Sequence, residues 1–303
     1  MQAGARVKER TTPSVSEGRS AAETAKAAVD RFREADGTSH GRALAYQTVF
    51  VVISGFIGLV GLASVLDVRA VRGTVIEMAK QLAPGPSTRL LEEAVRNGSS
   101  GAGTAMALGL GSALVAGVFA MAQFERSANR IAGRRDDRDT ARRWLVATGL
   151  ALSAGVAIAA ALLMIGGGQA IASGFGWEGG AATAWSVLRW PLGIVLATAG
   201  MYLLLRAAPA ARLAGSRGLL IGAVVAVALW LIFTLGLSVY FSTGSAQQEA
   251  YGSLLAVIAL VVWAGATSLA VHLGMAVAAE LGASGASAVS VPEAGSVRHA
   301  PSG

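Results

Sequence analysis

Cysteine is absent from the 303 residues, and histidine occurs only three times. The lack of cysteine excludes disulfides, thiolate nucleophiles and cysteine-bound metals. The three histidines, His40, His272 and His299, lie in different regions, and no HxH, HExxH, Walker A or GxGxxG motif is present. Metal-dependent hydrolysis needs clustered His, Asp or Glu ligands. The sequence therefore predicts no catalytic residue, no metal site and no cofactor, and hence a protein that is not an enzyme.

Charge is also scarce, because 14% of the residues are charged while 53% are hydrophobic, and the mean hydropathy is +0.56. The few charges gather in the tails and in short loops, which leaves long apolar segments between them. Segments of about 20 apolar residues, at 1.5 Å each, cross the ~30 Å hydrocarbon layer of a bilayer. The composition therefore predicts a polytopic membrane protein.

The pattern predicts an all-α fold, a bundle of six transmembrane helices. Glycine-rich stretches at 166–168 and 174–180 are expected to supply the reversal after the third span. The expected spans are 43–66, 104–124, 144–165, 185–205, 219–241 and 251–279. They define a transmembrane domain over 42–281, between a cytoplasmic tail over 1–41 and a disordered cytoplasmic tail over 282–303.

The net charge of +7 and the pI of about 10.5 raise the question of nucleic-acid binding. The positions of the Lys and Arg residues in the sequence argue against nucleic acid as a partner. Eight Lys and Arg precede residue 43, seven lie in 125–143, three in 206–217 and one in the C-terminal tail, so 19 of 25 fall on one predicted side. The positive-inside rule makes that side cytoplasmic and places both termini there. The excess of Ala, Gly and Arg over Lys indicates a bacterial gene, and hence the plasma membrane.

A short amphipathic helix is expected before the first span. Ser20 and Glu23 have the form of a capping box, and Gly37 is the expected C-cap. Apolar residues between them recur at helical spacing: Ala25, Ala28, Val29 and Phe32. Two interpretations stay open, a helix lying at the cytoplasmic membrane surface and a helix docked on the bundle.

Two further features concern the packing of the bundle. Residues 67–103 are polar enough to leave the bilayer, and they carry two helical stripes separated by Pro84-Gly85-Pro86, which predicts two short helices against the outer mouth. The second span has one face of small or polar residues, which is expected to point inward because small residues let helices approach closely. That face comprises Gly109, Ser112, Ala116, Ala120 and Gln123.

Arg189 is the most informative single residue. A fourth helix that began at Trp190 would be too short to cross the bilayer before Arg206, so Arg189 is expected about one turn inside the outer boundary. It either anchors the helix to Glu178, Glu249 or outer lipid phosphates, or it faces the bundle and binds the anionic group of a translocated solute or lipid.

The remaining candidate binding residues are His272, Tyr251 and Gly252. His272 lies on a small, polar stripe of the last span, where it either hydrogen-bonds another helix or relays protons. Tyr251 and Gly252 begin that span, where they either form a tight entry at the interface or contact a ligand. Asn129 is expected to cap or brace the cytoplasmic end of the second span.

These residues together resemble the YihY/BrkB family of bacterial inner-membrane proteins, over roughly residues 42–281. The matching elements are Ala43 to Tyr46, Asn129, Leu188-Arg189-Trp190-Pro191, Pro209, Gly222, Trp230, Tyr240, Tyr251-Gly252-Ser253-Leu254, Trp263, and Gly274 through Glu280. The resemblance implies a six-helix inner-membrane protein, linked in some members with virulence or serum resistance, whose biochemical role is not established.

Two departures limit what the resemblance implies. The Ser-Leu-x-Pro element of the first span is replaced by Val51, Val52, Ile53 and Ser54. The Gly-x-Glu of the last span is here Gly274-Met275-Ala276, although Glu280 matches a second acid near the helix end. Similar proteins have carried a ribonuclease label, which the scattered histidines do not support.

Two functions remain from the residues. One is translocation of a lipid or a small anionic solute, with membrane lipids as the expected partners. The other is a scaffold of the envelope that binds partners and moves nothing. A groove beside Arg189 would favour translocation, whereas a solid bundle would favour the scaffold. The sequence leaves open whether the chain forms a homo-oligomer.

Overall fold

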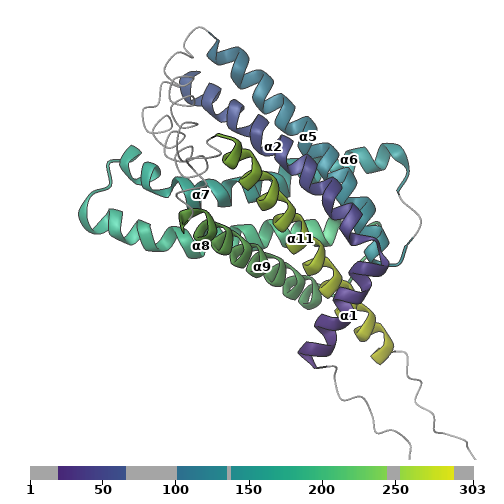
Figure 1. The fold of residues 1–303 in the computed structure, drawn as a ribbon. Coiled ribbons are helices and arrows are strands. Elements are labelled where there is room, and N and C mark those ends of the chain that lie inside the picture. Colours follow the sequence, from purple (N-terminus) through teal and green to yellow (C-terminus); the bar gives the residue numbers. More distant parts are fainter. Residues whose placement is uncertain (1–19, 66–100, 135–137, 244–252, 290–303) are drawn as a thin grey trace, which may run out of the picture.

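The structure is a computed structural model, and it describes residues 20–65, 101–134, 138–243 and 253–289 (Figure 1). Within these ranges every regular element is a helix. Six of the helical segments are long and apolar enough to cross a membrane. This confirms the predicted all-α bundle and its six spans.

The chain order begins with a short helix followed by the six spans, the third of which is interrupted by a π-helical turn, η2. The elements are α1 (Ala21–Glu34), α2 (Gly37–Val65), α5 (Ala102–Ile131), α6 (Thr140–Leu150), η2 (Ala151–Gly155), α7 (Val156–Gly174), α8 (Gly179–Ala207), α9 (Ser216–Thr243) and α11 (Ser253–Val289).

Contacts between neighbouring helices form a closed circuit. It runs from α2 to α11, α9, α8 and α7, and returns through η2 and α6 to α5, which packs along α2. The last helix, α11, also touches α1 and α5, so it connects the first half of the chain to the second. Figure 1 shows α2 and α5 side by side, and the α7–α8 hairpin reaching out on the opposite side of α11 from α5.

The N-terminal helix α1 is docked on the bundle. Its capping box is confirmed, because the Ser20 amide donates to Glu23 Oε2 at 2.8 Å and Ser20 Oγ accepts from the Glu23 amide at 3.2 Å. Phe32 is buried, and its ring contacts that of His272 on α11. Of the two interpretations of this helix, docking on the bundle is therefore the one that the structure supports, and a helix lying free on the membrane surface is not.

The expected C-cap of α1 at Gly37 is wrong. The helix ends at Glu34, and Asp36 turns the chain with a φ of 51°, a left-handed conformation that Asp adopts more readily than most residues. Gly37 is the first residue of α2. The boundary placed between residues 41 and 42 thus falls inside α2, and α11 likewise continues through 282–289, where a disordered tail was expected.

The reversal between the third and fourth spans is shorter than expected. Gly166–Gly168 lies inside α7, which continues to Gly174, and only residues 175–178 separate α7 from α8. Gly176 and Gly179 take the positive φ values, 65° and 55°. The triplet is part of α7, and the absent side chain at Gly168 leaves room for the side chain of Arg189 from α8.

Glycines allow two helix pairs to approach closely. A Cβ at Gly222 on α9 would lie 2.6 Å from the carbonyl oxygen of Gly274 on α11, and a Cβ at Gly58 on α2 would lie 2.6 Å from the amide nitrogen of Leu110 on α5. Such contact supplies the van der Waals packing that holds helices together in lipid. Of the face of α5 predicted to point inward, Gly109 and Ala120 are buried.

Ser112 departs from that prediction, because it is exposed in a groove that opens between α2 and α5. The two helices meet at Gly58 and Gly109, and a residue one turn from Gly109 can point past the partner helix rather than at it. Small size alone does not determine the inward direction.

The close approach of α9 and α11 gives a first prediction. Gly222→Ala is expected to lower the free energy of unfolding by about 1–3 kcal/mol, because the new methyl group overpacks against Gly274 and Ala278. Gly236→Ala on the same helix is the matched control, since a Cβ there meets no atom within 4 Å. Equilibrium unfolding in mixed detergent micelles measures both, and equal stability of the two variants would contradict the packing.

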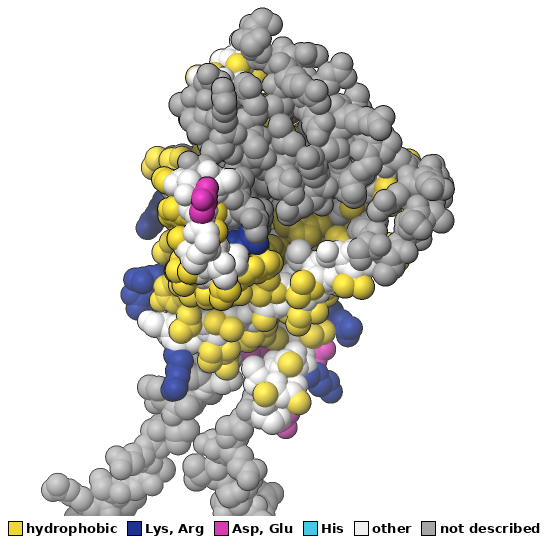
Figure 2. Space-filling model, turned by 90° about the vertical axis from the view of Figure 1, so that its left-hand side faces the viewer, with side chains coloured by type: hydrophobic (Ala, Val, Ile, Leu, Met, Phe, Trp, Pro, Cys, Tyr) yellow, Lys and Arg dark blue, Asp and Glu magenta, His cyan; other side chains and the backbone are white. Residues whose placement is uncertain are grey.

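The outer surface of the bundle is apolar. Large hydrophobic side chains are exposed on several spans, for example Leu108 at 66%, Val187 at 68% and Leu145 at 75%. Figure 2 shows hydrophobic side chains spread over the middle of one face, with several Lys and Arg at its edges and below. Exposed apolar area on this scale is typical of helices surrounded by lipid.

Some predictions lie outside the described residues. These are the two short helices expected in 67–103 and the entry of the last span at Tyr251 and Gly252.

Candidate functional site

Arg189 lies in the half of α8 nearer the α7–α8 turn, roughly 26 Å along the helix from Arg206 at 1.5 Å per residue. Its side chain crosses α7 at Gly168, where a Cβ would fall 2.6 Å from one guanidinium nitrogen. The Nε atom is buried and has no hydrogen-bond partner in the part of the chain that the structure describes. An arginine inside an apolar span, with a buried donor that has no partner among the described residues, is suited to binding an anion.

Aromatic rings surround this part of the hairpin. The Arg189 guanidinium carbon lies 5.8 Å from the ring centre of Trp190. Trp185 donates its indole N–H to the carbonyl of Gly168 at 2.7 Å, and it contacts Trp177 edge to face. Trp rings of this kind concentrate at the membrane–water interface. Glu178, an expected anchor, forms no ion pair with Arg189 within the described ranges.

His272 is fully buried where α2, α5 and α11 meet. Its Nε2 lies 2.9 Å from Ser127 Oγ on α5, and its Nδ1 lies 2.7 Å from the carbonyl oxygen of Ser268, one turn back on α11. Ser268 in turn donates its hydroxyl to the carbonyl of Gly41 on α2 at 2.8 Å. The predicted hydrogen bond from His272 to another helix is confirmed, and it belongs to a joint between three helices.

The geometry determines where the imidazole proton lies. A carbonyl oxygen only accepts, so Nδ1 of His272 carries the proton that bonds Ser268. Ser127 Oγ lies within reach of both Nε2 and the carbonyl of Phe124, at 2.9 and 2.8 Å, and it has one proton for the two acceptors. With that proton directed at Nε2, the neutral ring has a partner at both nitrogens.

A buried ion pair involves Glu125, which precedes Ser127 on α5. Glu125 is 1% exposed, and its Oε1 is 2.9 Å from Arg138 Nη1, although the alignment falls short of hydrogen-bond geometry. Arg138 also donates to three carbonyl oxygens at and just beyond the C-terminal end of α8, those of Ala207, Ala208 and Pro209, at 2.6–3.1 Å. This one side chain thus connects the Arg-rich loop, α5 and the loop between α8 and α9.

Further contacts gather the same segments at one end of the bundle. Asn129 Oδ1 accepts from the Ala210 amide at 2.8 Å, which confirms that Asn129 braces the end of its helix. Arg31 on α1 forms an ion pair with Glu280 on α11 at 2.6 Å and donates to the carbonyl of Ile131 at 3.2 Å. The loops that carry most of the arginines therefore share one end, as predicted.

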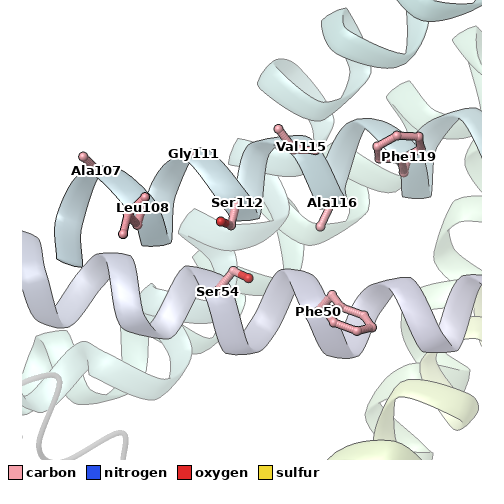
Figure 3. A pocket seen from close by; sticks show the side chains of 9 residues that line it. All are labelled: Phe50, Ser54, Ala107, Leu108, Gly111, Ser112, Val115, Ala116 and Phe119. Carbon is pink, nitrogen blue, oxygen red and sulfur yellow. The ribbon is translucent and has the colours of Figure 1, made fainter. Parts of the chain in front are cut away.

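The larger of the two described cavities is a groove of about 480 Å³ between α2 and α5, away from Arg189. Figure 3 shows Ser54 and Ser112 near one another between the two helices, with Phe50 and Phe119 farther along. The other residues that line it are Ala107, Leu108, Gly111, Val115 and Ala116. The groove carries no charged side chain, so it suits an acyl chain better than an anionic group.

Sequence reasoning did not find the roles of Glu125, Ser127 and Arg138. A usable signal exists for the first two, because no Gly or Pro interrupts 125–131 and the helix therefore continues beyond the apolar span. No sequence pattern distinguishes Arg138 from the six other arginines of its loop. No group of three or more His, Asp or Glu in the described ranges is arranged to hold a metal ion.

The fold and these contacts define an integral, multi-pass α-helical membrane protein. Residues 28–296 match the family model described as virulence factor BrkB. The chain therefore belongs to the BrkB virulence factor family, as the residue pattern indicated. No curated protein and no solved structure matches the chain.

Proposed function

We propose that this protein binds the anionic group of a membrane lipid or a small solute at Arg189 and moves it across the bacterial plasma membrane, without covalent chemistry. The observation behind the proposal is the buried Nε of Arg189, which lacks a hydrogen-bond partner among the residues that the structure describes. Burying a donor without a partner costs about 1–3 kcal/mol, and more for a charged group. A bound phosphate or carboxylate would remove that cost.

The depth of Arg189 supports a lipid phosphate as the anion. The guanidinium carbon of Arg189 lies 5.8 Å from the Trp190 ring, and Trp185 donates to the carbonyl of Gly168, over which the Arg189 side chain lies. Tryptophan is enriched at the membrane–water interface, which is why the proposal puts Arg189 at that level. Lipid phosphates are at that level, and an arginine side chain reaches them readily. In this proposal the end that carries the arginine-rich loops is cytoplasmic, and the α7–α8 turn is external.

The test is reconstitution of the full-length protein into liposomes with fluorescent anionic and zwitterionic lipids and with trapped anions. Arg189→Gln is expected to lower the rate of anionic lipid or anion movement at least tenfold, and Arg189→Lys to retain part of it. Arg206→Gln at the other, exposed end of α8 is the matched control and is expected to keep the wild-type rate. Equal rates for Arg189→Gln and wild type would overturn the proposal.

The scaffold is the second candidate, and the packing at the arginine-rich end favours it. Leu204, Leu205 and Met275 are buried there, and Ala226 and Ala278 fill the remaining space. A scaffold predicts background movement of every lipid and anion by the wild-type protein in the same liposomes. The two functions thus give opposite results in one assay.

A further inference from the structure

A second cavity, of about 400 Å³, lies at the arginine-rich end of the bundle, apart from Arg189 and from the α2–α5 groove. One wall is the turn between α1 and α2, and the other is the end of α5. The residues that line it are Glu34, Ala35, Asp36 and His40 on the first wall, and Arg130, Gly133 and Arg134 on the second.

Both walls are held in place by contacts outside the cavity. Asp36 reverses the chain through its left-handed conformation, and its carbonyl accepts from the Ser39 and His40 amides that begin α2. Gly133, with a φ of 73°, follows the end of α5 at Ile131 and leads to Arg134. Arg31 joins the walls, because it contacts Glu280 and donates to the Ile131 carbonyl.

The two walls carry charges of opposite sign. Glu34 and Asp36 are on one, Arg130 and Arg134 on the other, and no ion pair joins these four within the described residues. A simple anion or cation would be attracted by one wall and repelled by the other. A molecule with separated positive and negative groups would match both.

His40 adds a donor to this arrangement. The side-chain nitrogen of Gln123 lies 3.3 Å from His40 Nδ1, and an amide nitrogen only donates. In the arrangement where Gln123 donates to Nδ1, the imidazole proton is on Nε2. The cavity thus contains three groups that can donate to an anion and two carboxylates that can accept from an ammonium.

The cavity lies at the depth of lipid headgroups. His40 is about 4.5 Å before the start of the expected first span at residue 43, and Arg130 is about 9 Å beyond the end of the second at residue 124. The polar headgroup layer occupies roughly 5–8 Å on each side of the hydrocarbon. His40 thus falls near the inner edge of this layer and Arg130 just beyond its outer edge, so a headgroup can reach both walls while its acyl chains stay in the bilayer.

We propose that this cavity binds a zwitterionic phosphoamine group, the phosphate at Arg130 and Arg134 and the primary ammonium at Glu34 and Asp36. The group comes either from a phosphoethanolamine lipid headgroup or from a free phosphoamine. The site is independent of Arg189 and does not require that the protein moves lipids.

The test is lipid binding to the full-length protein by native mass spectrometry, with phosphatidylethanolamine, phosphatidylglycerol and phosphatidylcholine as probes. The wild-type protein is expected to prefer phosphatidylethanolamine, because phosphatidylglycerol lacks the ammonium and phosphatidylcholine has no N–H to donate. Free O-phosphoethanolamine is added as competitor. Displacement of the lipid identifies a free phosphoamine as a ligand, and retention identifies the headgroup.

Two double variants test the contribution of each wall separately. Arg130→Gln with Arg134→Gln is expected to weaken phosphatidylethanolamine binding about tenfold or more. Glu34→Gln with Asp36→Asn is expected to weaken it similarly while leaving phosphatidylglycerol binding equal or stronger, and Asn keeps the left-handed turn. Arg126→Gln, an exposed arginine of α5 outside the cavity, is the control.

The proposal is overturned if both double variants bind phosphatidylethanolamine as the wild type does, or if the acidic-wall variant leaves the lipid preference unchanged. Thermal unfolding of each variant shows whether it is folded. Arg189→Gln is expected to bind phosphatidylethanolamine normally at this cavity. If anion movement does not depend on Arg189, the proposed phosphoamine site is unaffected. If the cavity does not bind phosphatidylethanolamine, the proposed role of Arg189 is unaffected.

Discussion

Replacement of Arg138 by methionine is expected to lower the free energy of unfolding by about 3–5 kcal/mol, the largest effect of any single substitution considered for this bundle. The substitution leaves the Glu125 carboxylate buried at 1% exposure without its ion-pair partner. It also removes the donor that bonds three backbone carbonyls at the C-terminal end of α8. Equilibrium unfolding in mixed micelles measures the loss.

A double-mutant cycle isolates the ion pair from the carbonyl contacts. Adding Glu125→Leu to Arg138→Met removes the unpaired charge and is expected to restore part of the stability. The exposed Arg142→Met, from the start of α6, is the control and is expected to change stability by less than about 0.5 kcal/mol. The account of this end of the bundle fails if Arg138→Met and Arg142→Met are equally stable.

His272→Ala is expected to produce the second largest loss, about 2–4 kcal/mol. The ring is fully buried, and it packs edge to face against Phe32 on α1 and Phe124 on α5. Most of the loss comes from the cavity left by the ring, since a single hydrogen bond between helices in a membrane contributes only ~0.6 kcal/mol on average. The same unfolding measurement detects it.

His40→Ala provides the comparison, because His40 is only partly buried and its side chain is joined to Gln123 alone among the described residues. It is expected to lose under about 1 kcal/mol. Release of α1 should accompany the His272 variant, since Phe32 loses a contact, and faster proteolysis within α1 would report it. An unaltered α1 and wild-type stability would show that His272 does not join the helices.

Much of the architecture follows from local physics that the sequence displays. Apolar length alone locates the six spans, because a bilayer of fixed thickness demands helices of fixed length. The clustering of arginines correctly predicted that the 125–143 loop, the 206–217 loop and α1 share one end, as the contacts of Arg138 and Arg31 show. The capping box at Ser20 is likewise a local interaction.

The predictions that were wrong concern features that depend on contacts between helices. Three consecutive glycines usually interrupt a helix, yet Gly166–Gly168 stays helical beside α8, where Arg189 fills the space over Gly168. Ser112 belongs to a stripe of small residues, but the crossing of α2 over α5 leaves it exposed. The partner of His272, Ser127, is 145 positions away, and no spacing rule connects them.

The membrane topology is the claim on which the proposed function depends, and the absence of cysteine makes it directly measurable. Two exposed positions suit single-cysteine substitution, Ala141 at the arginine-rich end and Glu178 in the α7–α8 turn. They lie at opposite ends of the third span and its continuation. In intact bacterial cells, a membrane-impermeant maleimide is expected to label Glu178→Cys and to label Ala141→Cys only after lysis. Labelling of Ala141→Cys in intact cells would contradict the account.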